Sequence, residues 1–208
     1  MVVAHKQPGT AVLSSAYFAP VQWYQKLFRY ERCIVERYDH FLKQTYRNRC
    51  LIATTQGIQA LSIPIEKVET EKCLMRDVRI SSHGKWQQEH WNALLSAYGE
   101  SPFYDYYIDD LHPFFERKWG FLFDFNLAIA EKMCHLIDIS PSFVPSEGYE
   151  KEVENDFRET IRPKHPLPDP DFSPIPYYQV YRQKHGFLPN LSILDLLFNM
   201  GPEAVFYL

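Results

Sequence analysis

The chain has 208 residues, of which 46% are hydrophobic and 23% charged, a balance typical of a folded globular protein. This length suits a single domain spanning residues 1–208. The net charge of -4 argues against a nucleic-acid partner, because affinity for the phosphate backbone requires clustered lysine and arginine. No apolar run reaches the roughly 20 residues of a membrane helix, and no signal-peptide pattern opens the chain, so we expect a cytoplasmic protein without a membrane span.

The first part of the chain predicts a strand, a short helix and a second strand. Residues 11–18 form an apolar run that suits a strand, and Pro20 suits the first turn of a helix. Apolar residues then recur at three- and four-residue spacing over residues 21–30, and residues 33–35 suit another strand. This order is typical of a βαβ unit with parallel strands, and open α/β sheets usually bind ligands at the carboxyl ends of their strands.

A β-hairpin is predicted next. Residues 50–53 and 61–65 are apolar and flank a turn near Gly57, and alternating apolar residues in the second arm indicate a half-buried strand. Pro64 places that arm at a sheet edge or a strand end, since proline has no N–H to donate. Residues 75–80 predict a further short strand.

Helices are predicted for the middle of the chain and for its C-terminal part. Residues 86–98 have helical periodicity, and the Ser101-Pro102 dipeptide supplies the start of a second helix that Pro113 interrupts. Residues 122–136 predict a long third helix. Ser192, three residues before an aspartate, resembles a capping box that opens a short final helix, which Gly201-Pro202 ends.

Six prolines lie between Arg162 and Pro176, a density that excludes a regular helix or a central strand. We therefore expect residues 162–176 to form an extended strap across the surface. The predicted fold class is α/β, with α+β as the alternative. A small mixed sheet would contain the N-terminal βαβ unit and the hairpin, and the second half would be helical.

The heptad KQTYRNR, residues 43–49, is the first candidate site. If this segment is extended, Lys43, Arg47 and Arg49 share one face, where they could bind a phosphate or a carboxylate. The alternative is a solvated edge strand whose cations discourage pairing between sheets. In the same extended geometry Cys50 points away from the cations, which favours a packed core thiol over an activated nucleophile.

Motif spacing predicts neither a metal site nor a cofactor. The four cysteines form no CxxC pair, and the eight histidines form no HxH or HExxH motif. His90 shares a helix stripe with Trp86 and Leu94, which favours a hydrogen-bonded core residue. No GxSxG, P-loop or GxGxxG motif is present, so hydrolase, NTPase and dinucleotide-binding functions have no support.

Four stretches of the chain resemble the WbqC-like protein family, in the order expected for it. They are residues 16–24, the heptad, residues 86–103, and residues 186–204, where GFLPNLSILDLLFNMGPEA is the most specific. The resemblance implies a transferase that moves an acyl or aminoacyl group onto a nucleotide-linked sugar during synthesis of bacterial O-antigen or capsule. The expected partner is a phosphorylated or carboxylated small molecule.

Two features depart from the family pattern. Ser14-Ser15-Ala16 stand where many members have His-Gln-Pro, so no catalytic residue is assigned, and the strap replaces a helix and a Gly-rich turn. The alternative is therefore a non-catalytic binding or scaffolding protein. Asparagines of the heptad and of the C-terminal motif would hydrogen bond to the ligand, and a tyrosine would stack on it. The predicted substrate-binding residues are Ser15, Tyr17, Lys43, Arg47, Asn48, Arg49 and Asn190.

Overall fold

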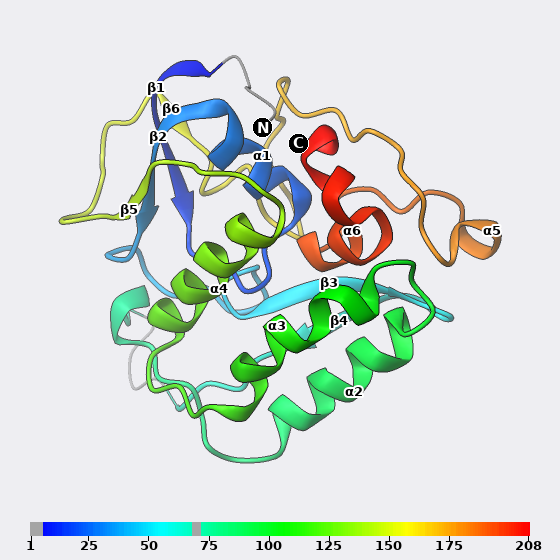
Figure 1. Cartoon of the computed structure of the whole chain (residues 1–208). Helices are drawn as coiled ribbons and strands as arrows, with labels where there is room; N and C mark the ends of the chain where they lie inside the picture. The colour runs from blue at the N-terminus through cyan, green and yellow to red at the C-terminus, as the bar shows by residue number, and fades with distance from the viewer. Residues whose placement is uncertain (1–5, 68–71) are drawn as a thin grey trace.

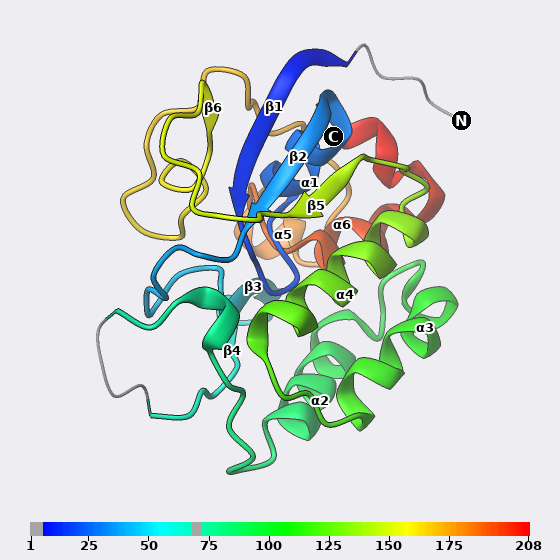
Figure 2. The same cartoon turned by 90° about the vertical axis from the view of Figure 1, so that its left-hand side faces the viewer.

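The computed structural model describes residues 6–67 and 72–208. A parallel sheet lies on one side of the molecule, helices α2 and α3 lie on the other, and a β-hairpin lies between them (Figure 1; Figure 2 shows the sheet side). The fold class is α/β, as the sequence predicts. The strands are β1 (Gln7–Ser14), β2 (Tyr30–Glu36), β3 (Arg49–Thr54), β4 (Gly57–Ser62), β5 (Phe143–Pro145) and β6 (Asn155–Asp156). The helices are α1 (Val21–Arg29), α2 (Trp86–Tyr98), α3 (Tyr104–Glu116), α4 (Leu122–Leu136), α5 (Arg182–His185) and α6 (Ile193–Met200), with 3-10 turns η1 (Met75–Asp77) and η2 (Gly201–Tyr207).

The predicted βαβ unit is confirmed. Strand β1 pairs in parallel with β2, and α1 forms the crossover between them. The sheet order is β5-β2-β1-β6, so the N-terminal strands occupy its centre. Strand β1 begins and ends four residues earlier than predicted. Residues 15–18 are buried loop, and the positive φ of Phe18, 37°, bends the chain toward the start of α1.

The predicted hairpin is also confirmed, with β3 and β4 antiparallel and Gly57 at the turn with a φ of 105°. The strand predicted for residues 75–80 is wrong. This segment forms the 3-10 turn η1 followed by isolated bridges from Arg79 to Phe121 and from Ile80 to Ile65. A short apolar run does not specify a strand when no neighbouring strand continues the ladder.

Helices α2 and α4 match their predicted spans, whereas α3 begins later than predicted. Its first helical residue is Tyr104, because Phe103 has a non-helical backbone, with φ of -118° and ψ of 9°, and its N–H donates to the carbonyl of Phe198 at 3.0 Å. Pro113 does not interrupt α3, which continues to Glu116. A proline in the last turn removes only one of the helix's hydrogen bonds.

Helix α6 starts at the predicted cap, but its aspartate has another role. The Ser192 hydroxyl accepts from the N–H of Leu194 at 3.3 Å. The carboxylate of Asp195 is fully buried and accepts from Tyr98 at 3.0 Å and from Tyr177 at 2.7 Å. Burial raises the pKa of Asp195, and these donors oppose the increase. Asp195 therefore joins α2, α6 and the end of the strap region.

The proline-rich segment contains neither helix nor strand, as predicted, and an ion pair attaches it to the N-terminal half of the chain. The ammonium of Lys26, a fully buried residue of α1, lies 2.7 Å from the carboxylate of Asp169, which also accepts from the side chain of Gln22 at 2.8 Å. Within residues 6–67 and 72–208, no helix combines the length and the apolar character needed to span a bilayer.

Candidate functional site

The heptad is a series of turns rather than an extended strand. Gln44 has a positive φ of 62°, and β3 begins only at Arg49. The predicted alternation is therefore wrong, since an irregular backbone does not place every second side chain on one face. Lys43 is exposed to solvent, whereas Arg47 is buried, with 3% of its surface exposed.

Buried Arg47 pairs with Asp39, which follows the carboxyl end of β2. One guanidinium nitrogen of Arg47 donates to Oδ2 of Asp39. The Asp39 side chain is 10% exposed, and its Oδ1 atom is buried. Burial raises the pKa of Asp39 above its ordinary value, although the charge and the hydrogen bond of Arg47 act in the opposite direction. A carboxyl group with a raised pKa is better suited to accept a proton than an ordinary aspartate.

A second buried ion pair lies at the same edge of the sheet. Glu36 is the last residue of β2 and is fully buried, and its carboxylate lies 3.4 Å from the guanidinium of Arg158. Ser146 donates to Glu36 at 2.7 Å, and Arg158 also contacts Asp156 at 2.6 Å. Glu36 ends β2 and Asp39 follows it by three residues, so both ion pairs lie where this strand ends.

Asn126 connects this edge to the loop after β1. Its side-chain amide, on α4, donates to the hydroxyl of Ser15 at 2.9 Å and to the backbone carbonyl of Arg47 at 2.8 Å. The loop after β1 and the heptad are therefore held together. We call the following set the sheet-edge cluster: Glu36, Asp39, Arg47, Asn126 and Arg158.

The sheet-edge cluster contains buried polar atoms that have no hydrogen-bond partner within the described ranges. They are Oδ1 of Asp39, Nε of Arg47 and Oδ1 of Asn126. Nε of Arg49, outside the cluster, is also buried and without a partner among the described residues. Most buried polar groups in proteins are paired, and an unpaired one costs about 1 to 3 kcal/mol. These atoms therefore lack the hydrogen bonds that most buried polar groups form.

The structure separates the remaining predicted residues from one another. Tyr17 is fully buried, and its hydroxyl donates to Nδ1 of His90 at 2.9 Å while its ring stacks on Phe125, so it has no free face for a ligand. The amide of Asn48 donates to the backbone carbonyl of Ile63 at 3.0 Å. Asn190 exchanges hydrogen bonds with Gln22 in the first turn of α1.

His90 is buried as an uncharged imidazole. Burial lowers its pKa to about 4, and a hydrogen bond to the backbone of Ser62 only partly opposes this shift. At neutral pH the ring accepts from Tyr17 and fixes α2 against the loop after β1. These contacts describe a structural histidine, as the sequence predicts.

Three of the four thiols are buried, Cys73 is half-buried, and none has a lowered pKa. Burial raises the pKa of Cys33 to about 12 and raises that of Cys50 further. No three His, Cys, Asp or Glu side chains of residues 6–67 and 72–208 are arranged to hold a metal ion. The chemistry that the described residues offer is hydrogen bonding, charge pairing and proton transfer.

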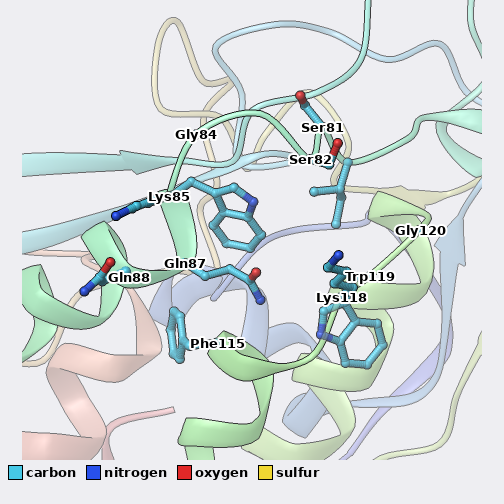
Figure 3. Close-up of a pocket in the computed structure, with 12 residues that line it drawn as sticks. Ser81, Ser82, Gly84, Lys85, Gln87, Gln88, Phe115, Lys118, Trp119 and Gly120 are labelled. Carbon is cyan, nitrogen blue, oxygen red and sulfur yellow. The ribbon is translucent and has the colours of Figure 1, made fainter.

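A narrow space borders α4, and a larger pocket lies before the start of this helix. Beside Ser15 and Asn126 there is only a narrow gap with no room for a water molecule. A larger pocket of about 570 Å³ lies between residues 80–88 and residues 115–120 (Figure 3). No predicted site residue lines this pocket.

Comparison with known proteins agrees with the sequence motifs. The model of the WbqC-like protein family matches residues 15–162 and 170–207, and the gap falls in the proline-rich strap. An uncharacterised protein of Mycobacterium tuberculosis (strain ATCC 25618 / H37Rv), Rv1507c, is 24% identical over 223 residues, which cover 95% of this chain and 96% of that protein. No solved structure matches the chain.

Proposed function

Because this chain belongs to the WbqC-like protein family, we propose that it binds a phosphorylated or carboxylated small molecule at the sheet-edge cluster and transfers an acyl or aminoacyl group to it. A nucleotide-linked sugar is the candidate substrate, within the synthesis of a bacterial surface polysaccharide. The observation that carries the proposal is the free Oδ1 of Asp39 beside the buried, unpaired Nε of Arg47.

The position of the sheet-edge cluster supports a binding role. Glu36 is the last residue of β2, Asp39 follows it, and the loop after β1 contacts Asn126. Open parallel sheets bind ligands at this edge, because the loops that leave neighbouring strands diverge there. The Nε–H groups of Arg47 and Arg49 are charged donors that have no partner among the described residues, which suits an anion.

Asp39 is the residue to which we assign proton transfer. When an amine or hydroxyl attacks the carbonyl carbon of an activated acyl donor, a new bond to that carbon forms and the bond to the donor's leaving group breaks. The attacking atom loses a proton, and a nearby base accepts it. Arg47 holds Oδ2 of Asp39 and leaves Oδ1 free, so the carboxylate is both oriented and able to accept. Its raised pKa increases its basicity.

Ligand binding is tested by thermal-shift titration with UDP-N-acetylglucosamine, UDP and inorganic phosphate. We expect concentration-dependent stabilisation of the wild type. Arg47→Lys keeps a positive charge opposite Asp39 but removes Nε, and should weaken binding about tenfold, the equivalent of one charged hydrogen bond. Arg76→Lys, at a largely exposed arginine, is the matched control. No shift with any of the three compounds would contradict the proposal.

Asp39→Asn tests the assignment of proton transfer. In an assay that detects an acyl or aminoacyl product on the sugar nucleotide, this variant should retain binding and lose turnover. The alternative function, binding without catalysis, is favoured by Ser14-Ser15-Ala16 at the positions where many family members have His-Gln-Pro. Binding by the wild type without any turnover would support that alternative.

A further inference from the structure

The 570 Å³ pocket is built from two segments that are fixed by backbone hydrogen bonds. One wall is the approach to α2 and its first turn, and the other is the connection from α3 to α4 (Figure 3). The N–H of Ile80 donates to the carbonyl of Gly120 at 3.0 Å, and the N–H of Ser81 donates to the carbonyl of Pro64 at 2.9 Å. The pocket is therefore preformed, and its volume is in the range typical of small-molecule sites.

Aromatic side chains form the apolar part of the pocket. Trp86, Phe115 and Trp119 line it. The rings of Trp86 and Trp119 both pack on Phe125 in the core, with centroid distances of 5.9 and 4.9 Å. Because they are supported from behind, these rings keep their positions, and a ligand needs no rearrangement of the wall to make apolar contacts.

Polar side chains lie across the pocket from the aromatic ones. Figure 3 shows Ser81 and Ser82 on one side, Phe115 and Trp119 on the other, and Gln87 between them. The amide nitrogen of Gln87 donates to the carbonyl of Arg117 at 2.7 Å, which holds this side chain in place.

The indole N–H of Trp119 is buried and has no hydrogen-bond partner among the described residues. In Figure 3 the indole nitrogen lies on the edge of the ring that points toward Gln87. A buried N–H without an acceptor is unfavourable, so an oxygen atom of a ligand placed here would recover the lost hydrogen bond. The pocket thus has an unfilled place for one acceptor.

Two lysines give the pocket a positive charge. Lys85 and Lys118 both line it and are exposed, and within residues 6–67 and 72–208 neither forms an ion pair. Lys85 extends away from the centre of the view in Figure 3, so Lys118 is the better placed of the two. An ammonium group at the rim of an aromatic pocket favours a ligand with a negative charge.

We propose that this pocket binds a pyranose unit that carries one phosphate or carboxylate group. The C–H groups of such a ring suit the aromatic wall, its hydroxyls suit the serines, Gln87 and the indole N–H of Trp119, and its acidic group suits Lys118. A fatty acid would leave the polar groups unsatisfied. The site is separate from the sheet-edge cluster and does not depend on its function.

Calorimetric titration of the full chain with glucose 1-phosphate, glucuronic acid, glucose and inorganic phosphate tests the proposal. We expect at least one of the two acidic sugars to bind at least tenfold more tightly than glucose or phosphate, and the tighter of the two identifies the acidic group. Trp119→Phe keeps the ring but removes the N–H, and should weaken binding about fivefold to tenfold. Lys118→Gln should weaken binding of the acidic sugars to the level of glucose, while Lys151→Gln, at an exposed lysine outside the pocket, should have no effect.

Inorganic phosphate that binds as tightly as the acidic sugars and loses affinity in Lys118→Gln would overturn the proposal, as would the absence of saturable binding of both acidic sugars. If Trp119→Phe does not fold, Lys118→Gln provides the test alone, because a surface lysine contributes little to folding. Unchanged affinity in Lys118→Gln would then overturn it. Arg47→Lys should bind the acidic sugars as the wild type does, so failure of the sheet-edge proposal and failure of this one can be distinguished.

Discussion

Lowering the pH from 7 to 4 should reduce the stability of this protein through the imidazole of His90. The ring is buried, with 5% of its surface exposed, and burial lowers its pKa from 6.5 to about 4. Between these two values the unfolded chain binds a proton that the folded chain does not bind. The free energy of unfolding is therefore greatest above pH 6.5 and falls as the pH decreases.

The size of the loss follows from the shift in pKa. One pKa unit corresponds to about 1.4 kcal/mol, so His90 should reduce the free energy of unfolding by about 2 kcal/mol at pH 5 and about 3 kcal/mol at pH 4. Protonation would also remove the acceptor for the Tyr17 hydroxyl, which donates to Nδ1 at 2.9 Å. Asp39 and Asp195 have raised pKa values and act in the opposite direction, so the wild-type curve alone is not sufficient.

Urea unfolding at several pH values between 7 and 4, on wild type and His90→Gln, isolates this contribution. The variant should be less stable at pH 7, and the difference from wild type should shrink by about 3 kcal/mol toward pH 4. His135→Gln, at an exposed histidine, is the control and should follow the wild type. Parallel curves for wild type and His90→Gln would refute the assignment of a depressed pKa to His90.

Three further predictions concern the core. Asp195→Asn should lower the free energy of unfolding, measured by urea denaturation, by about 2 to 4 kcal/mol, because buried donors lose a charged acceptor. The surface control Asp109→Asn should not change it. Gly201→Ala should cost about 2 to 4 kcal/mol in the same assay, since φ is 54° and a Cβ would lie 2.5 Å from the Phe103 ring. In a DTNB assay at pH 8, one thiol of the native protein, Cys73, should react rapidly, and all four should react after denaturation. Rapid reaction of more than one thiol in the native protein would contradict the burial of the other three.

The sequence predicted the elements whose signals are local. The βαβ unit, the hairpin around Gly57 and helices α2 and α4 follow from periodicity and turn residues within short windows. The strand predicted for residues 75–80 was wrong because an apolar run of this length is compatible with several structures. The helix predicted to begin at Ser101-Pro102 begins later. The N–H of Phe103 pairs with the carbonyl of Phe198 in α6, a residue that is distant in the chain.

The candidate site was less predictable for the same reason. Arg47 was identified by its charge, but the partner that buries it, Asp39, lies in the loop after another strand. Glu36 and Arg158 are 122 residues apart, and no spacing rule relates them. Lys43, Arg47 and Arg49 would share one face only if the heptad were extended, and the positive φ of Gln44 shows that it is not. Pairing of distant charges is a property of the fold and leaves no local pattern.

The position of α6 has a consequence for synthesis of the chain on the ribosome. This helix lies near the C-terminus, and seven of its eight residues are buried, in contact with α1, α3 and β3. These partners are complete long before α6 has been translated. The nascent chain must therefore hold their apolar surfaces uncovered until α6 has emerged from the ribosome, and a product that stalls before α6 would present that surface to chaperones and proteases.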